Sequence, residues 1–324
     1  MVITSLGATI QRLLQAGLAP STQRAYTAGK KYLMFCQESG TAPLPVTEKK
    51  LLGFVAFAIN QRLKHQTIKC YLSAVRHLQV ACGGGDPRVE SMPLLELALR
   101  GARKEQSGDP KRTRLPITPS ILEQLRQVWN REPSDRDHIM LRAVCCVGFF
   151  GFFRSGELTA PEKGEFDPNQ HLTFNDVMID NPTNPRAVSI RLKQSKTDPF
   201  RQGVSIYLGR TESLLCPVAA LLSYLVLRGR SDGPLFQFRD GKALTRPLLV
   251  SALRRALLSA GFKAEDYAGH SFRIGAATTA AACGVPAEVI KTLGRWKSQA
   301  YQLYVRLPTD QLLSISKKLA QSDL

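Results

Sequence analysis

A tryptophan and two tyrosines stand among basic residues in GRWKSQAYQLYVR, residues 294–306. Trp296 lies between two cations, and Tyr301 and Tyr304 follow it three residues apart. A phenol in such a setting can act as a nucleophile, but its unperturbed pKa of ~10 means that another group must take the proton. The indole N–H of Trp296 could donate to a phosphate oxygen. The alternative is that all three rings pack in an apolar core.

Cations that could hold a phosphate occur at three further places. His270 and Arg273 are three residues apart in GHSFR, at the start of a segment of small residues, so a helix would place them on one face. Arg154 follows the apolar run VCCVGFFGFF, where Glu157 either neutralises it or orients its guanidinium toward an external anion. Lys196 lies in SKTD, inside a predicted hairpin, where a lysine is often only solvated.

These residue types together suit phosphoryl transfer without a metal. Two guanidinium groups can neutralise the pentacoordinate phosphorus that forms when a phenol attacks a phosphodiester. Lysine can protonate the departing 5′ oxygen, and histidine can accept the phenolic proton. A covalent phosphotyrosine would retain the bond energy, so that strands could be rejoined without ATP. We predict neither a metal nor a cofactor.

The first 105 residues are predicted to form an all-helical domain. Apolar residues recur at helical spacing in 19–40, 47–63 and 65–85, and polar caps or glycines bound these segments. Residues 106–116, QSGDPKRTRLP, combine glycine, two prolines and three cations with almost nothing apolar. This composition indicates a basic linker between two domains.

Residues 117–324 are predicted to form the second domain. Two helices are predicted at about 118–132 and 136–153. They precede segments with the pattern of β-strands, in which apolar and polar residues alternate, as in AVSIRLKQ at 187–194. The segment SKTDPFRQG is predicted to be the turn of a hairpin, and helices resume from about 215, ending with the amphipathic TDQLLSISKKLAQ. The expected fold class is mainly α with a small antiparallel β-sheet.

The charge predicts a polyanionic partner. Lys+Arg 44 against Asp+Glu 26 gives a net charge of +18, and the excess is spread over both predicted domains. The longest apolar stretch, 144–153, is far shorter than the ~20 residues that span a bilayer, so we expect nucleic acid and no membrane. The amino end lacks the pattern of a signal peptide, which favours an intracellular protein. Seven scattered cysteines indicate reduced, buried thiols and no zinc finger.

Basic and hydroxyl side chains on the polar faces of the predicted helices suit contacts with DNA phosphates, although a solvated face would look much the same. The candidates for DNA binding lie in the helical domain, the linker and the hairpin: Thr22, Arg24, Lys30, Lys31, Lys64, His65, Thr67, Lys69, Arg76, Lys111, Arg112, Arg114 and Arg201.

The order RSGEL, SKT, HSFR, LGRW and QLYVR resembles the tyrosine recombinases, the phage integrase family. The resemblance covers nearly the whole chain, because STQRAYTAGKKYLMFC and HQTIKCYLSAVRHL look like the helical, SAM-like core-binding domain of that family. KTDPFRQG, CPVAALLSYL and HSFRIGAATTAA are similar to recombinases of DIRS-like and Ngaro-like retrotransposons and of Crypton elements.

The resemblance implies a role for each candidate residue. Arg154 and Arg273 would clamp the phosphate, Lys196 would be the general acid, with Lys193 as a weaker rival, and His270 would assist proton transfer. In the family a histidine or tryptophan directly follows Leu-Gly, but here Arg295 intervenes, so either Arg295 or Trp296 takes that position. The nucleophile falls on Tyr304, and Tyr301 would pack.

The resemblance also implies a larger assembly. Two domains would clamp double-stranded DNA, with the basic linker passing between them. Dimers on each site would form a tetrameric synapse, and a carboxyl-terminal helix would dock on a neighbouring subunit. A eukaryotic element would place the protein in the nucleus, where it would integrate mobile DNA through a 3′-phosphotyrosyl intermediate. The competing hypotheses are a catalytically silent DNA-binding protein, a type IB topoisomerase and, less favoured, a metal-dependent transposase.

Overall fold

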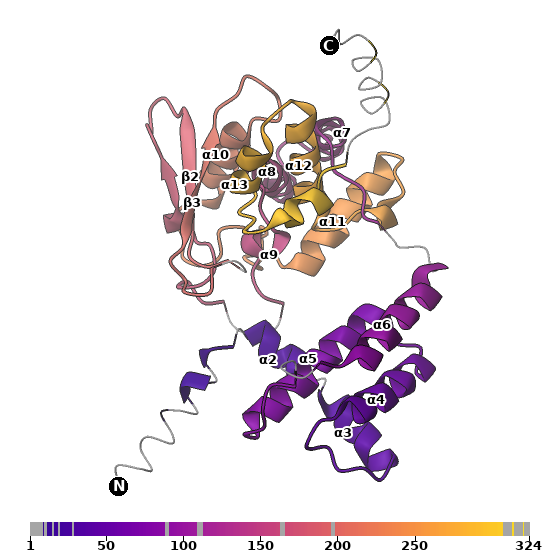
Figure 1. Ribbon diagram of the computed structural model, residues 1–324. Helices are drawn as coiled ribbons and strands as arrows, with labels where there is room; N and C mark the ends of the chain where they lie inside the picture. Colours follow the sequence, from indigo (N-terminus) through magenta and orange to yellow (C-terminus); the bar gives the residue numbers. More distant parts are fainter. Residues whose placement is uncertain are drawn as a thin grey trace. The chain divides into compact units, whose positions relative to one another are not determined.

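The computed structural model describes residues 9, 12–14, 16–18, 20–27, 29–87, 91–108, 113–162, 166–195, 198–306, 313 and 320. The chain divides into two compact units, Met1–Lys111 and Arg112–Leu324 (Figure 1). The division falls within the segment predicted to be a linker. Most of the predicted carboxyl-terminal helix lies outside the described residues, as do Lys111, Arg112 and Lys196.

The first unit is helical among its described residues. Its helices are α2 (Pro20–Tyr26), α3 (Gly29–Glu38), α4 (Glu48–Asn60), α5 (His65–Ala81) and α6 (Pro93–Glu105). Thr47 begins α4 with a side chain that accepts a hydrogen bond from the Lys50 N–H at 3.4 Å. Tyr32, Phe54 and Ile68 are fully buried and form the centre of a separate apolar core.

The prediction of one continuous helix over 19–40 is wrong. The segment forms α2 and α3, and Thr27 accepts a backbone hydrogen bond from Lys30 at the break. Gly29 opens α3, and a Cβ atom built there would lie 3.9 Å from the Cβ of Ala74 in α5. Close packing of two helices on α5 therefore outweighs the helical periodicity that runs through the whole segment.

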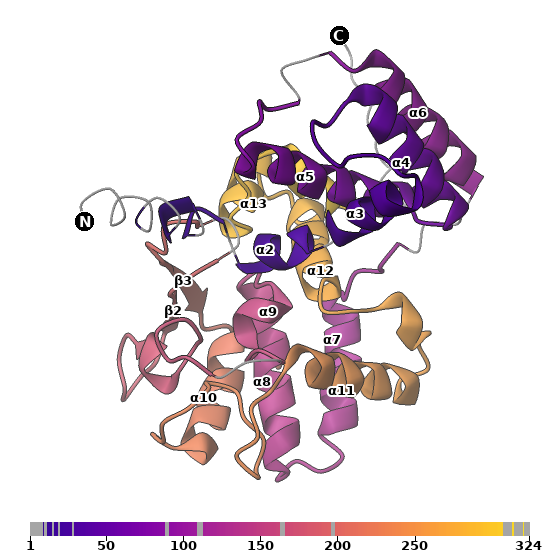
Figure 2. The same ribbon diagram turned by 90° about the horizontal axis from the view of Figure 1, so that it is seen from below.

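The second unit is built around α8 (Arg136–Phe150), whose ten buried residues, 139–141 and 143–149, occur on all sides of the helix. Three helices pack on it: α7 (Pro119–Trp129), α10 (Pro217–Arg228) and α12 (Ser271–Ala282) (Figure 2). The other helices are α9 (Ser155–Leu158), α11 (Arg246–Ser259) and α13 (Ala287–Leu293), with 3₁₀ turns η2 (Phe174–Asp176), η3 (Ala264–Asp266) and η4 (Gln299–Leu303). The 3₁₀ turn η1 (Gln106–Gly108) belongs to the first unit and follows α6.

The predicted sheet is present, and it is antiparallel. Its three strands lie in the order β1 (Val177–Ile179), β2 (Ala187–Leu192) and β3 (Val204–Gly209). Val188 and Ile190 of β2 are fully buried and Leu192 is 2% exposed, so the predicted alternation is confirmed. The fold class is therefore the predicted one: mainly α with a small antiparallel sheet.

Two further observations bear on the sequence predictions. All seven cysteines are free, but Cys70, Cys82 and Cys283 are exposed, so the prediction of buried thiols is wrong for these three. Each of the three lies on a helix, or at the end of one, whose apolar side faces away from the cysteine. The apolar character of a single residue does not reveal which side of a helix it occupies.

Among the described residues, no helix combines the length and apolar character that crossing a membrane would need.

Candidate active site

The carboxylate of Glu157 holds two arginines where α8 ends. After Phe150 the chain turns through Phe152, whose φ is +51°, and Arg154 begins the short helix α9. The Arg154 N–H donates to Oε2 of Glu157 at 2.8 Å, and its Nη1 donates to Oε1 at 2.7 Å. Nη2 of Arg295 donates to Oε2 at 2.8 Å. Glu157 therefore both neutralises part of the charge on Arg154 and fixes its orientation.

Arg295 reaches this carboxylate from a left-handed backbone conformation, with φ +56°. Its guanidinium also donates to the carbonyl oxygens of Gly151 and Phe152, each at 3.2 Å. Burial, opposed by Glu157, lowers the pKa of Arg295. Two guanidinium groups around one carboxylate leave a net positive charge in a largely buried place.

Arg273 brings a third guanidinium to the same place. It is fully buried on α12 and donates to the carbonyl oxygens of Phe152 and Gly294. Burial, together with the charges of Arg154 and Arg295, lowers its pKa to about 9. Its Nε has no hydrogen-bond partner. Because these cations destabilise one another, a bound anion would stabilise the cluster.

Trp296 and Tyr304 close over the Arg273 guanidinium. The guanidinium carbon lies 4.1 Å from the Trp296 ring centroid and 5.6 Å from that of Tyr304. The Tyr304 ring lies 5.0 Å from Trp296 and 6.5 Å from His270. The ring contact found for Tyr301 is with Trp296, at 6.5 Å. Of the two tyrosines, Tyr304 is therefore the one beside the cation and the histidine.

Helices were predicted from about 215 onward, but the two tyrosines do not lie in an α-helix. Tyr301 lies in the 3₁₀ turn η4, and Tyr304 follows its last residue. Oγ1 of Thr278 in α12 donates to the Tyr304 carbonyl oxygen at 3.1 Å and accepts from the Arg306 N–H at 3.0 Å. Sequence reasoning missed Thr278, because nothing local to TTAAA indicates a partner that follows 26 residues later.

His270 and Arg273 approach Tyr304 from different environments. His270 is the exposed residue that precedes α12, whereas Arg273 is fully buried within it. The structure thus brings five of the six predicted catalytic residues together: Arg154, His270, Arg273, Trp296 and Tyr304.

The sixth predicted residue, Lys196, lies outside the described residues. The described residues Ser195 and Asp198 of this hairpin lie beside the site, because they line one open hollow of about 500 Å³ together with Arg295 and Trp296. The rival lysine, Lys193, is occupied elsewhere: its Nζ donates to Oδ2 of Asp176 at 2.5 Å and to the carbonyl oxygens of Pro168 and His171 at 2.6 and 3.1 Å. These three bonds use all the protons of the ammonium group.

Most of the predicted DNA-binding residues in the helical unit reach solvent. Lys30, Lys31, Lys64 and Lys69 are exposed, while Thr22, His65 and Thr67 are half-buried. Burial, followed by the charges of Lys69 and Arg103, lowers the pKa of His65. Arg103 thus adds a cation to this part of α5 that the sequence analysis missed.

The other candidates are more constrained or are only partly described. Arg76 donates to both carboxylate oxygens of Asp86, at 2.7 and 2.6 Å, so its charge is already neutralised. Arg114 donates to the Glu265 carbonyl oxygen. Arg201 is exposed at the end of the hairpin turn, with φ +53°. The backbone of Arg24 is in α2, and its side chain lies outside the description.

One group of described residues has the composition of a metal site. Oxygen or nitrogen atoms of Glu132, Asp135 and His138 lie within 4.8 Å of one another. Oδ1 of Asp135 accepts hydrogen bonds from the N–H groups of Asp137 and His138 and so caps α8. This capping accounts for the position of Asp135 without an ion.

The mostly helical unit with a three-stranded antiparallel sheet has the fold of tyrosine recombinase catalytic domains. The structure of a lambda integrase dimer bound to a COC′ core site matches with a TM-score of 0.57 and 17% identity, over 93% of this chain and 94% of that one. The XerH site-specific recombinase bound to palindromic difH substrate, in a post-cleavage complex, matches with a TM-score of 0.55 and 18% identity, over 85% of this chain and 71% of that one.

Sequence comparison points in the same direction. An integrase/recombinase xerD homolog of Selenomonas ruminantium is 25% identical over 307 residues, which cover 89% of this chain and 82% of the relative. No family model matches the chain. Together the relative and the shared fold support the tyrosine recombinase/integrase family that the sequence motifs predicted.

Proposed function

We propose that this chain is a site-specific DNA recombinase that breaks and rejoins strands through a covalent bond to Tyr304. The observation that carries the proposal is the meeting of Tyr304 with Arg273, Trp296 and His270 beside the arginine pair on Glu157. These residues come from separate parts of the sequence, and an apolar core would not need three guanidinium groups in one place.

In the proposed reaction the Tyr304 oxygen attacks the scissile phosphorus of duplex DNA. A bond forms between that oxygen and the phosphorus, and the bond from phosphorus to the 5′ oxygen breaks, which leaves a 3′-phosphotyrosine. His270 takes the phenolic proton, and Lys196 protonates the departing 5′ oxygen. Arg154 and Arg273 neutralise the negative charge that develops on the equatorial oxygens. Attack by a 5′ hydroxyl on the phosphotyrosine reverses these steps and rejoins the strand.

A covalent adduct tests this proposal without a known target site. The protein is incubated with nicked duplexes whose sequence is randomised, and complexes that survive detergent are recovered and sequenced. We expect adducts with the wild type and with Tyr301→Phe, and none with Tyr304→Phe. Peptide mapping should place the modification on Tyr304, and EDTA should not prevent it. DNA binding without any adduct would instead favour a catalytically silent DNA-binding protein.

The finer proposals concern biology and assembly. The resemblance of the motifs KTDPFRQG, CPVAALLSYL and HSFRIGAATTAA to recombinases of DIRS-like, Ngaro-like and Crypton elements supports the proposal that the protein integrates a mobile element. A eukaryotic host would require a nuclear enzyme. We propose dimers on each DNA site and a tetramer in the synapse. Recombination between two sites in a purified system would separate this function from a type IB topoisomerase, which only relaxes supercoils.

A further inference from the structure

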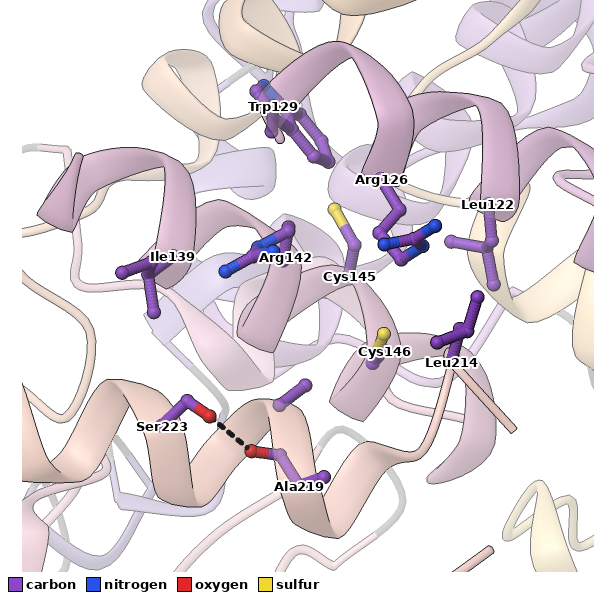
Figure 3. A pocket seen from close by; sticks show the side chains of 11 residues that line it. Leu122, Arg126, Trp129, Ile139, Arg142, Cys145, Cys146, Leu214, Ala219 and Ser223 are labelled. Carbon is purple, nitrogen blue, oxygen red and sulfur yellow. Dashed lines mark hydrogen bonds between the residues drawn. The ribbon is translucent and has the colours of Figure 1, made fainter. Parts of the chain in front are cut away.

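A small cavity lies between α7, α8 and α10, lined by residues other than those of the candidate active site. Its volume is about 160 Å³. The walls include Trp129, Ile139, Cys145 and Ala219, and two arginines, Arg126 and Arg142, also line it (Figure 3). Cys145 and Trp129 are 1% and 4% exposed, so they form an apolar wall that is fixed by packing. Leu214, 72% exposed, and the exposed Ser223 line the part that opens to solvent.

The two arginines differ in how their charges are compensated. Arg126 donates from Nε and Nη2 to the two carboxylate oxygens of Glu123, at 2.9 and 2.7 Å. Arg142 donates from Nη1 to the neutral Oδ1 of Asn130 at 2.8 Å, and no described acidic residue pairs with it. Burial, and then the charge of Arg126, lowers the pKa of Arg142. A half-buried guanidinium therefore lines the cavity without a counter-charge.

The nearby thiol cannot supply that counter-charge. Cys146 lines the same cavity and lies nearer α10 than Cys145 does in the view of Figure 3. Burial raises its pKa to about 12, although Arg142 opposes the shift. The thiol is therefore neutral near pH 7. An unpaired, partly desolvated cation beside apolar walls is best stabilised by an anion that carries its own apolar surface.

We propose that this cavity binds a small organic carboxylate, whose apolar body fills the space beside Trp129 while its two oxygens pair with the Arg142 guanidinium. The size is appropriate, because a cavity of about 150 Å³ lined by apolar side chains holds one benzene ring. A planar guanidinium matches a carboxylate through two parallel hydrogen bonds. The ligand needs both a carboxylate and an apolar body, because the carboxylate pairs with Arg142 and the apolar body contacts the apolar wall.

Calorimetry with benzoate as the probe tests the proposal on the full chain. We expect saturable binding with a Kd of about 1 mM, typical of a ligand this small. Neutral benzamide and inorganic phosphate should each bind at least tenfold more weakly than benzoate. Arg142→Gln should weaken benzoate binding at least tenfold, whereas Arg255→Gln, which removes an exposed cation from α11, should leave it unchanged.

A second variant separates loss of the site from loss of the fold. Ser223 lines the cavity and is exposed on α10, so Ser223→Leu should block the space while the helix remains intact. We expect this variant to lose benzoate binding while keeping the wild-type melting temperature. The proposal is overturned if benzoate does not bind the wild type, if benzamide or phosphate binds as tightly, or if the Arg142 or Ser223 variant, folded as the wild type, retains full affinity.

Discussion

Glu157 decides how the arginines at the candidate active site are arranged. Its two oxygens accept three hydrogen bonds, two from Arg154 and one from Arg295, and its side chain is only 7% exposed. A carboxylate in this position keeps the guanidinium of Arg154 from moving when no phosphate is bound. Arg295 contacts Glu157 on one side and the carbonyl oxygens of 151 and 152 on the other. In the proposed reaction we therefore assign it a positioning role rather than direct contact with the phosphate.

Arg295→Asn should test this positioning role. Asparagine tolerates the left-handed backbone at 295, so the substitution removes the guanidinium without imposing a backbone change. Losing one charge-assisted hydrogen bond to Glu157 removes ~1.5–3 kcal/mol. If about half of this free energy is expressed in the orientation of Arg154, cleavage slows about 4- to 12-fold. The rate of adduct formation and the affinity for intact DNA should be measured separately.

The expected pattern is a slower rate with little change in DNA affinity. Arg255→Gln removes the same charge at an exposed place and serves as the control for a general electrostatic effect. If Arg295→Asn weakens DNA binding as strongly as it slows cleavage, Arg295 contacts the phosphate itself and the positioning role is wrong.

His65 offers a pH-dependent signal of DNA binding. Burial and the charges of Lys69 and Arg103 lower its pKa below ~6.5, so the neutral imidazole is favoured in the free protein. Bound phosphates would offset these cations and raise the pKa, so DNA binding should take up a proton and strengthen as the pH falls below 7. Titration of the imidazole resonance by NMR, with and without DNA, measures the shift. An unchanged pKa at saturating DNA would exclude this face from the interface.

Among the elements of the second unit, α12 packs closely against the segment around Ile117, which precedes α7. The Ile117 N–H donates to the Ser271 carbonyl oxygen at 2.9 Å, and a Cβ atom on Gly275 would lie 1.8 Å from the Ile117 carbonyl oxygen. Glycine at 275 is therefore what allows the backbone to approach the helix. The same helix carries Arg273 and, through Thr278, holds the segment of Tyr304.

Gly275→Ala should destabilise the second unit by about 3 kcal/mol, because the methyl group cannot fit without moving the backbone. A loss of this size lowers the melting temperature of a unit of ~200 residues by about 6–12 °C. Gly209→Ala is the matched control, since no atom lies within 4 Å of the added carbon. Equal melting temperatures for the two variants would contradict the close approach.

Local sequence patterns predicted the helices and strands themselves better than the breaks and long-range contacts between them. Alternation in AVSIRL predicted which side of β2 is buried, and Thr47 and the glycines marked helix ends, because these signals depend on near neighbours. The break between α2 and α3 depends on packing against α5, which no local pattern reports. The motifs supplied Arg154, Arg273 and Tyr304, but the bond from Arg273 to the carbonyl of Phe152 joins residues 121 apart. Sequence spacing contains no information about such a contact.

The whole molecule carries a net charge of +18, and each unit presents cations that a DNA backbone could contact. In the helical unit, Lys64 and Lys69 are exposed at the beginning of α5. After burial, the charges of Lys69 and Arg103 are what lower the pKa of His65 there. Displacement of counterions makes such binding depend on salt, with a logarithmic slope of about −0.9 for each phosphate neutralised.

Replacing both lysines, Lys64→Gln and Lys69→Gln, should therefore reduce the magnitude of this slope by about 1.8 and weaken binding to all DNA sequences alike. Lys49→Gln with Lys50→Gln removes the same charge at the start of α4, where we assign no DNA contact, and should leave the slope within ~0.4 of the wild type. DNA affinity between 50 and 300 mM salt, measured by fluorescence anisotropy, distinguishes the pairs. If both reduce the slope equally, only the net charge of the molecule matters, and α5 is not a specific part of the DNA interface.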